Sequence, residues 1–272
     1  KKVKKLKLLV GAAVGAGPNE FIRAKAILKE DLDMIVVDTA HGHTKKVSEI
    51  IKFIKKKKNK RTALCAGNIA TAEAAKFLAK LGVDVVKVGI GPGSICTTRL
   101  VAGIGVPQLS AILAAKKGLG KKKITLVADG GIKFSGDISK ALAAGADAVM
   151  IGSLFAGTNE SPGKLIKKNG KYFKSFRGMG SIGAMNKGSA DRYFQKKQKD
   201  PSKYVPEGVE GLVKYKGPVE KIIYQLIGGL KSSMGYLGSK KIKDLRSKPK
   251  FVKITKAGFY ESMVHNIDKV LK

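Results

Sequence analysis

The sequence has few cysteines and no long apolar run. Its 272 residues contain two cysteines, Cys65 and Cys96, which are too few for a disulfide framework and have no companions at the spacing of a metal site. No stretch approaches the roughly 18 apolar residues that a membrane-spanning helix needs. The lysine-rich start, residues 1–7, lacks the apolar stretch and cleavage site of a signal peptide. We therefore expect a cytoplasmic protein with no membrane association.

Acidic residues are also scarce. Twenty Asp and Glu stand against 54 Lys and Arg, which gives a net charge of +34. Such a charge would ordinarily indicate nucleic acid or an anionic substrate as a partner. The lysines, however, fall in short runs at 55–58, 121–123 and 196–197, with no interleaved aromatic residues and no zinc-finger spacing. We favour solvated surfaces for these runs and keep nucleic acid binding as the less favoured alternative.

Short apolar runs at wide intervals predict buried parallel strands. The runs are residues 6–10, 34–37, 62–66, 83–88, 124–128 and 148–151. Between most of them lie segments that predict helices, namely 20–29, 45–56, 72–81 and 137–144. This βαβα alternation predicts an α/β fold. Polar and glycine residues at the strand ends are expected in a TIM barrel and equally in a doubly wound sheet.

The pattern changes at about residue 158 to a glycine-, lysine- and aromatic-rich stretch that reaches residue 217. A segment this long without periodic elements is more often a functional lid than a linker, and we predict a mobile flap at about 158–217. A helix is expected over 219–230. We predict that residues 1–272 form one catalytic domain, without a tandem regulatory domain.

A glycine-rich loop at residues 89–99 follows the strand at 83–88 and carries the better nucleophile candidate. Its glycines can bring backbone N–H groups close to an anion, and Ser94 adds a hydroxyl. Cys96 lies two residues further on, where a thiolate could attack a substrate held by this loop. An isolated cysteine is more often a small buried hydrophobe, and that alternative stays open here. Cys65, inside an apolar strand, keeps the buried interpretation.

Two further loops, 129–131 and 152–153, follow the last two predicted strands. In TIM barrels the loops after strands seven and eight commonly bind phosphate, which makes these the seventh and eighth strands and residues 6–10 the third. The first two βα units are then absent from this chain. Because the sheet would have two open edges, we expect the 272 residues alone to be aggregated or inactive.

Six motifs occur in the order found in the inosine monophosphate (IMP) dehydrogenase family. They are residues 89–99 (GIGPGSICTTR), 128–132 (ADGGI), 150–153 (MIGS), 177–181 (RGMGS), 191–194 (DRYF) and 206–211 (PEGVEG). From about residue 8 to residue 268 the sequence resembles the catalytic domain of the bacterial-type members. The resemblance implies a TIM (β/α)8 barrel, here lacking its first two units.

The resemblance also implies a mechanism. Cys96 would add to C2 of the purine, hydride would pass to NAD, and the covalent thioimidate would be hydrolysed to xanthosine monophosphate. Arg192 and Tyr193 would be catalytic residues on the family's mobile flap, where Arg192 would help to activate water once NADH leaves, and Thr98 would contact the same water.

The family's binding residues map onto this sequence one by one. The substrate residues implied for IMP are Ser94, Asp129, Gly131, Gly152, Ser153, Met179, Gly180 and Glu207. The residues implied for NAD are Asp38, Ala40, Asn68 and Gly89. Backbone carbonyls of Gly91, Gly93 and Cys96 would bind potassium, and a neighbouring subunit would complete this site with Glu261, Ser262 and Met263. A homotetramer is implied.

Three positions depart from the family pattern. Phe176 replaces a tyrosine that gives its hydroxyl to the phosphate, Met263 replaces a common histidine, and Lys87 would stand near the NAD site. His41 and His43 form an imaginable metal pair without a third ligand.

Two alternatives remain. Guanosine monophosphate (GMP) reductase shares the barrel and the cysteine loop, although Arg192 and Glu207 favour the dehydrogenase. A non-catalytic, basic nucleic-acid-binding barrel would instead explain the charge.

Overall fold

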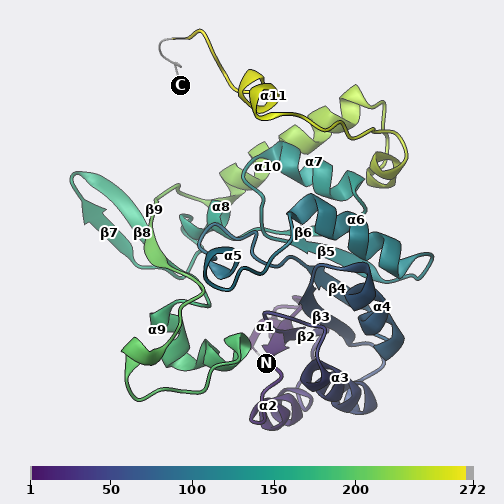
Figure 1. Ribbon diagram of the computed structural model, residues 1–272, viewed down its shortest axis with the longest axis vertical. Coiled ribbons are helices and arrows are strands. Elements are labelled where there is room, and N and C mark those ends of the chain that lie inside the picture. Colours follow the sequence, from purple (N-terminus) through teal and green to yellow (C-terminus); the bar gives the residue numbers. More distant parts are fainter. Residues whose placement is uncertain (1, 268–272) are drawn as a thin grey trace.

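The computed structural model describes residues 2–267; the predicted single domain also includes residues 1 and 268–272, which lie outside the described residues. Six parallel strands pair with their neighbours in chain order. They are β1 (Gly11–Val14), β2 (Met34–Asp38), β3 (Ala63–Ile69), β4 (Val85–Val88), β5 (Thr125–Asp129) and β6 (Ala148–Met150). The sheet is curled, with helices along its outer side (Figure 1). This is the predicted α/β fold, a partial TIM barrel.

Helices lie between most of these strands, before the first of them and after the last. They are α1 (Lys2–Lys5), α2 (Glu20–Ile27), α3 (Lys45–Lys57), α4 (Ala72–Leu81), α5 (Thr98–Val101), α6 (Gln108–Leu119), α7 (Ser135–Ala143), α8 (Ser153–Ala156), α9 (Ile182–Ala184), α10 (Val219–Tyr236) and α11 (Lys256–Glu261). The hydroxyls of Thr44 and Thr71 accept hydrogen bonds from the first turns of α3 and α4, as N-caps do. Among residues 2–267, none of the helices could span a membrane.

A repeated aspartate clamp ties the amino ends of the strands together in pairs. Asp33 precedes β2, and its carboxylate accepts a hydrogen bond of 2.7 Å from the backbone N–H of Val10, while its own N–H donates to the carbonyl of Val10. Asp84 does the same to Leu64 in β3, and Asp147 to Leu126 in β5. Each clamp fixes the strand register with one side chain and two hydrogen bonds.

The main core lies between the sheet and helices α2 to α6. Side chains such as Val37, Leu64, Val86 and Leu126 are fully buried there. Because β3 and β4 are buried on both faces, their sequences are nearly continuous apolar runs. A second cluster joins α7 to α10 around Leu226.

One predicted strand is misplaced. The apolar run at 6–10 was expected to form the first strand, but β1 begins at Gly11, which pairs with Met34. Leu6, Leu8 and Leu9 are exposed by 55% or more. The reason is that the ladder starts only after the Asp33 clamp, where β2 supplies a partner, and the preceding leucines have no facing strand among the described residues. The count of six strands is unaffected.

Some elements were not predicted from the sequence. They include helix α6 and the short helices α1, α5, α8, α9 and α11. Another is a three-stranded antiparallel sheet, inside the segment predicted to be irregular, made of β7 (Leu165–Lys168), β8 (Lys171–Arg177) and β9 (Glu210–Lys214). It projects from the barrel in Figure 1. Asn169 and Gly170, both with positive φ, connect β7 to β8, and Asn-Gly is the strongest short-range hairpin signal.

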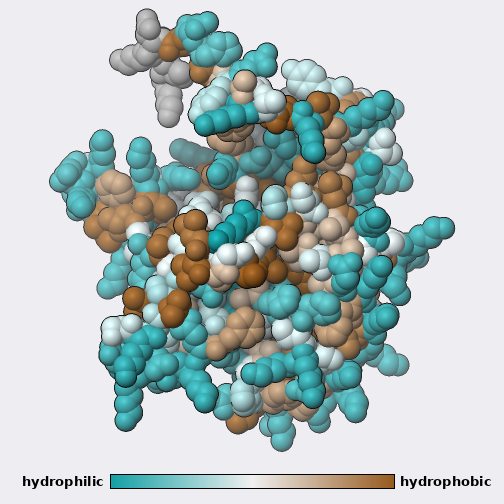
Figure 2. All heavy atoms as spheres, in the orientation of Figure 1, coloured by the Kyte–Doolittle hydropathy of each residue, from teal (hydrophilic) through white to brown (hydrophobic). Residues whose placement is uncertain are grey.

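The hydrophilic side chains are widely spread. Figure 2 shows them along much of the outline of the face that it presents, with many apolar side chains nearer the middle.

Candidate active site

The carboxyl ends of the strands surround a cavity of about 310 Å³. Asn68 of β3, the loop after β4, Asp129 at the end of β5 and Gly152 after β6 all line it. Parallel strands in a barrel deliver their following loops to one rim, so residues far apart in sequence meet here. The sequence-predicted residues that line the cavity are Ala40, Asn68, Gly89, Gly91, Gly93, Cys96, Thr98, Asp129, Gly152, Met179, Arg192 and Tyr193.

Other predicted residues border the cavity. Asp38 meets Arg192 of the cavity wall in an ion pair. Ser153 is the first residue of α8, directly after Gly152. The remaining ones, Ser94, Gly131, Gly180 and Glu207, lie in loops that adjoin the lining residues.

The predicted potassium residues are only partly brought together. Gly91, Gly93 and Cys96 share one loop, whereas Glu261, Ser262 and Met263 lie in or just after α11, which stands apart from the barrel in Figure 1. Between residues 2 and 267, no three His, Cys, Asp or Glu side chains are grouped as they would be to hold a metal ion. His43 instead packs on the ring of Phe77, with 4.5 Å between ring centroids.

Glycine is required where the cysteine loop leaves β4. Gly89 has φ of 149°, and a Cβ there would lie 2.2 Å from the carbonyl oxygen of Asp129. Only glycine accepts both the conformation and the close approach. The loop after β4 can therefore run directly against the end of β5.

The thiol of Cys96 is partly exposed and donates a hydrogen bond of 3.2 Å to the hydroxyl of Thr98. Two loops hold it in place: the N–H of Thr97 donates to the carbonyl of Glu207, and the N–H of Val209 donates to that of Ile95. Glu207 in turn donates its N–H to the carbonyl of Gly180. The cysteine, the 178–180 loop and the 206–209 loop form one hydrogen-bonded unit.

Cys65 is a useful contrast. It is 3% exposed inside β3, and burial raises the pKa of its thiol to about 11. Because the thiolate is the reactive form, Cys65 is inert at neutral pH, as its place in an apolar strand predicts.

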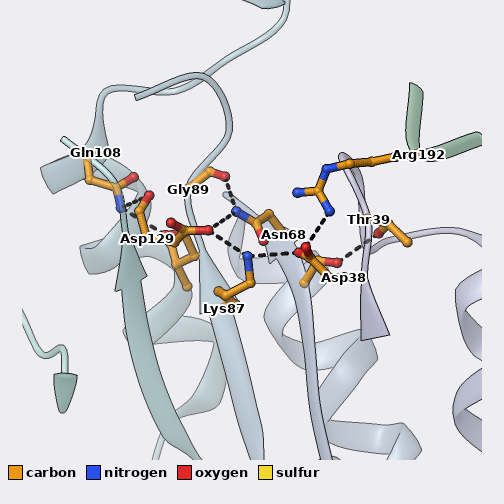
Figure 3. A network of polar contacts seen from close by, with 10 residues as sticks. Asp38, Thr39, Asn68, Lys87, Gly89, Gln108, Asp129 and Arg192 are labelled. Carbon is orange, nitrogen blue, oxygen red and sulfur yellow. Dashed lines mark hydrogen bonds and ion pairs between the residues drawn. The ribbon is translucent and has the colours of Figure 1, made fainter. Parts of the chain in front are cut away.

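A buried lysine joins two carboxylates at the floor of the site (Figure 3). The ammonium nitrogen of Lys87 lies 2.9 Å from Asp38 Oδ1 and 2.6 Å from Asp129 Oδ2. The amide nitrogen of Asn68 donates to the same Asp129 oxygen, at 2.9 Å, and to the carbonyl of Gly89, at 2.7 Å. Gln108 donates to the carbonyl oxygens of Val88 and Asp129. Lys87 and Gln108 are therefore site residues, and the sequence does not assign either of them a role in this network.

Asp38 also forms an ion pair of 2.6 Å with the guanidinium of Arg192. Burial alone would raise the pKa of Asp38, but the two cations Lys87 and Arg192 outweigh it and hold that pKa below its usual value. Burial acts to lower the pKa of Arg192, and its ion pair with Asp38 reverses the effect, so that pKa is raised. Both groups are charged at neutral pH.

The segment that carries Arg192 has a small core of its own. Met185, Ala190 and Tyr204 are buried together, with Tyr193 packed against them. A 3-10 turn over Ala190–Tyr193 directs Arg192 to Asp38 and Tyr193 to the Cys96 cavity. Burial raises the pKa of Tyr193, although Arg192 opposes this, so Tyr193 is neutral at neutral pH.

Phe176 lies where the site meets a second, larger cavity of about 1050 Å³, bounded by α8 and β8. The Cζ of its ring would be 3.9 Å from a Cβ on Gly152. A tyrosine here would therefore present its hydroxyl beside the Gly152 loop, and phenylalanine presents none.

Comparison with known proteins agrees with this arrangement. Residues 1–265 match the family model described as "IMP dehydrogenase / GMP reductase domain". The inosine-5'-monophosphate dehydrogenase of Chlorobaculum parvum is 55% identical over 263 residues, 96% of this chain and 53% of the relative. That of Methanocaldococcus jannaschii is 54% identical over 271 residues, 97% of this chain and 54% of the relative.

A solved structure matches over a similar extent. GMP reductase C318A from Trypanosoma brucei, crystallised with guanosine 5'-monophosphate, superposes with a TM-score of 0.86 and 46% identity, covering 96% of this chain and 53% of that chain. The chain thus spans about half the length of the relatives that it matches. On the family match and these identities, this chain belongs to the IMP dehydrogenase / GMP reductase family.

Proposed function

We propose that the whole protein oxidises IMP to xanthosine monophosphate with NAD, in guanine nucleotide synthesis, and that Cys96 is its nucleophile. The observation that carries the proposal is the convergence of Cys96, Thr98, Arg192 and Tyr193 on one cavity. Relatives named inosine-5'-monophosphate dehydrogenase, at 54–55% identity, support the substrate and the reaction.

Cys96 would add its sulfur to C2 of the purine, and the C2 hydrogen would leave as hydride. NAD supplies the acceptor for this hydride. Water would then add to C2 of the thioimidate, and the sulfur would leave with its electron pair, which regenerates Cys96 and releases xanthosine monophosphate. The hydrogen bond between Cys96 and Thr98 supports a role for Thr98 beside the same carbon.

The residues assigned to NAD fit a group rich in hydroxyls. Asn68 Oδ1 is buried, has no hydrogen-bond partner in the described structure, and belongs to a residue that lines the cavity. Buried acceptors without partners are costly, and a ribose hydroxyl would satisfy this one. The neighbouring cations keep the carboxylate of Asp38 ionised, and this carboxylate would accept hydrogen bonds from the hydroxyls of the nicotinamide ribose. Ala40 and Gly89 would line the same site.

The substrate residues would divide the nucleotide among them. Asp129 would accept from the ribose of IMP, since its carboxylate is oriented by Lys87 and Asn68. The phosphate would lie among loop residues, and the base against the hydrogen-bonded loops beside Cys96. The phosphate residues are Ser94, Gly131, Gly152 and Ser153, and the base residues are Met179, Gly180 and Glu207.

Arg192 would alternate with the dinucleotide. Arg192 forms an ion pair with the same Asp38 carboxylate that would bind the nicotinamide ribose. The flap and NAD would therefore compete for Asp38 and bind to it one after the other. Residues of about 158–217 would thus act as the flap of a single catalytic domain. With the flap closed, Arg192 and Tyr193 would activate water for hydrolysis.

We further propose a potassium site on the carbonyls of Gly91, Gly93 and Cys96, completed by Glu261, Ser262 and Met263 of a neighbouring subunit in a homotetramer. A loop that presents several backbone carbonyls offers the donors that a monovalent cation takes. A cytoplasmic location also stays a prediction.

The test is direct. Purified protein is mixed with IMP and NAD, and NADH absorbance is followed with and without potassium. GMP with NADPH is the parallel reaction, because the GMP reductase of Trypanosoma brucei resembles this chain closely. IMP-dependent NADH formation supports the dehydrogenase, and NADPH-dependent conversion of GMP to IMP would replace it with the reductase. Salt-sensitive nucleic acid binding with neither reaction would favour a non-catalytic barrel.

A further inference from the structure

A single buried lysine lies between the two ribose-binding carboxylates of the proposed site. Lys87 is 4% exposed in the middle of the sheet, and its nitrogen lies within 3 Å of Asp38 on β2 and of Asp129 on β5. Figure 3 shows it pointing between them, with Asn68 above. A lysine this buried is rare unless paired, and here it is paired twice.

The sheet is shaped to admit this side chain. Gly67 on β3 is the register partner of Lys87, and a Cβ on Gly67 would lie 2.7 Å from the Cβ of Lys87 and 2.6 Å from its carbonyl oxygen. Any larger residue at position 67 would push the lysine out of line. The absence of a side chain on Gly67 thus leaves room for Lys87 to extend between the two carboxylates.

The charged and titratable groups around Lys87 come from the neighbouring strands and from the segment that carries Arg192. Asp38 lies on β2 and Asp129 on β5. The Cys65 thiol lies on β3, and the positive charge of Lys87 opposes the rise in its pKa that burial causes. Arg192 reaches the network through Asp38. Two carboxylates that share one nitrogen repel each other strongly without it.

Arg192 cannot be the permanent partner of Asp38 in the proposed cycle. It belongs to the proposed flap, and it would have to leave before a ribose could bind to Asp38. At that moment Lys87 is the cation that remains on this carboxylate in the described structure. The same nitrogen also orients Asp129, on the IMP side.

We propose that Lys87 is a positioning residue that holds the carboxylates of Asp38 and Asp129 in place and correctly spaced, so that the dinucleotide and IMP sites share one internal cation. This rests on the proposed function. It assigns Lys87 no contact with either substrate. It makes the two binding sites dependent on each other through a group that touches neither ligand.

The test compares Lys87→Met, Lys87→Gln and Lys87→Arg in the whole protein. Without Lys87, Asp38 keeps its burial and loses one of its two cations, and it loses the other when the flap opens for NAD. Asp38 should therefore take up a proton at higher pH in the Met and Gln variants. The acid limb of kcat/KM for NAD should move up by at least about one pH unit, a tenfold loss at a pH on that limb. KM for IMP should rise as well. Lys87→Arg should restore the wild-type limb.

A matched control separates this from a loss of stability. Lys58 lies outside the site and the proposed flap, and its ammonium group donates to the backbone carbonyl of Thr62 and lies 3.9 Å from Asp84, which precedes β4. Lys58→Met should lower the Tm and leave the pH limb in place. Lys87→Gln keeps a polar group and carries the test if Lys87→Met does not fold.

The outcomes are distinct. Wild-type protein that forms no NADH from IMP contradicts the proposed function itself. Active wild type, with Lys87→Met or Lys87→Gln showing an unchanged pH limb and both KM values within about twofold, would overturn the role of Lys87. The same is true if Lys87→Arg shifts the limb as far as Lys87→Gln does.

Discussion

Replacing Arg192 with alanine should separate the two chemical steps. In the structure the guanidinium forms a 2.6 Å ion pair with Asp38, and its side chain is only 15% exposed. Hydrogen bonds to charged groups contribute about 1.5–3 kcal/mol, so losing this pair should disfavour flap closure by about 10- to 150-fold. The proposed hydride transfer, which would need the flap open, should keep its rate.

Rapid mixing of Arg192→Ala with IMP and NAD should therefore give a burst of about one NADH per site, followed by a steady state slowed at least about tenfold. KM for NAD should fall, because Asp38 is no longer shared with the flap. Arg246→Ala is the control, since it removes another ion pair, with Asp147, at the opposite end of the strands. A burst that slows as much as the steady state would show that Arg192 serves hydride transfer and refute this reasoning.

Three further outcomes are expected. Cys96→Ala should abolish NADH formation and retain IMP binding by calorimetry, because the proposed phosphate, ribose and base contacts remain; residual turnover above a few per cent would remove Cys96 from its role. Phe176→Tyr should lower KM for IMP by about two- to tenfold, as one added hydrogen bond contributes about 0.5–1.5 kcal/mol, and an unchanged KM would place the phosphate elsewhere. The pKa of Asp38 is lowered, so its contribution to stability is complete above about pH 4 and is lost as the pH falls through that lowered pKa. Asp38→Asn should therefore flatten the acid side of a plot of Tm against pH. An unchanged plot would argue against the ion pairs of Asp38.

The strand ends were the most predictable part of the site. Asp38, Asn68 and Asp129 each follow an apolar run, and a barrel brings such positions to one rim. The glycines before Cys96 were informative for the same reason, because Gly89 permits a contact that no other residue allows.

Partners across the sheet were not predictable. Lys87 lies within an apolar run, and nothing local indicates that carboxylates on β2 and β5 enclose it. The ion pair between Arg192 and Asp38 depends on how the flap folds onto the barrel, which periodicity does not report. Conversely, Leu6 to Leu9 misled the strand assignment, because hydrophobicity indicates a preference for burial but not the presence of a partner.

The aspartate clamps make the barrel modular in units of two strands. Asp33, Asp84 and Asp147 join β1 to β2, β3 to β4 and β5 to β6. At the amino ends of the junctions between these pairs, the N–H groups of Ala63 and Thr125 donate to the carbonyls of Asp33 and Asp84, and no aspartate clamp of this kind is seen there among the described residues. Other side-chain contacts, such as Thr62 to Leu32 and Lys87 to Asp129, do cross these junctions. Recombination at a junction between pairs leaves every clamp intact. Recombination inside a pair separates the aspartate from the backbone N–H group that donates to its carboxylate. Chimeric or shortened barrels of this family should therefore tolerate exchange of strand pairs far better than exchange of single strands.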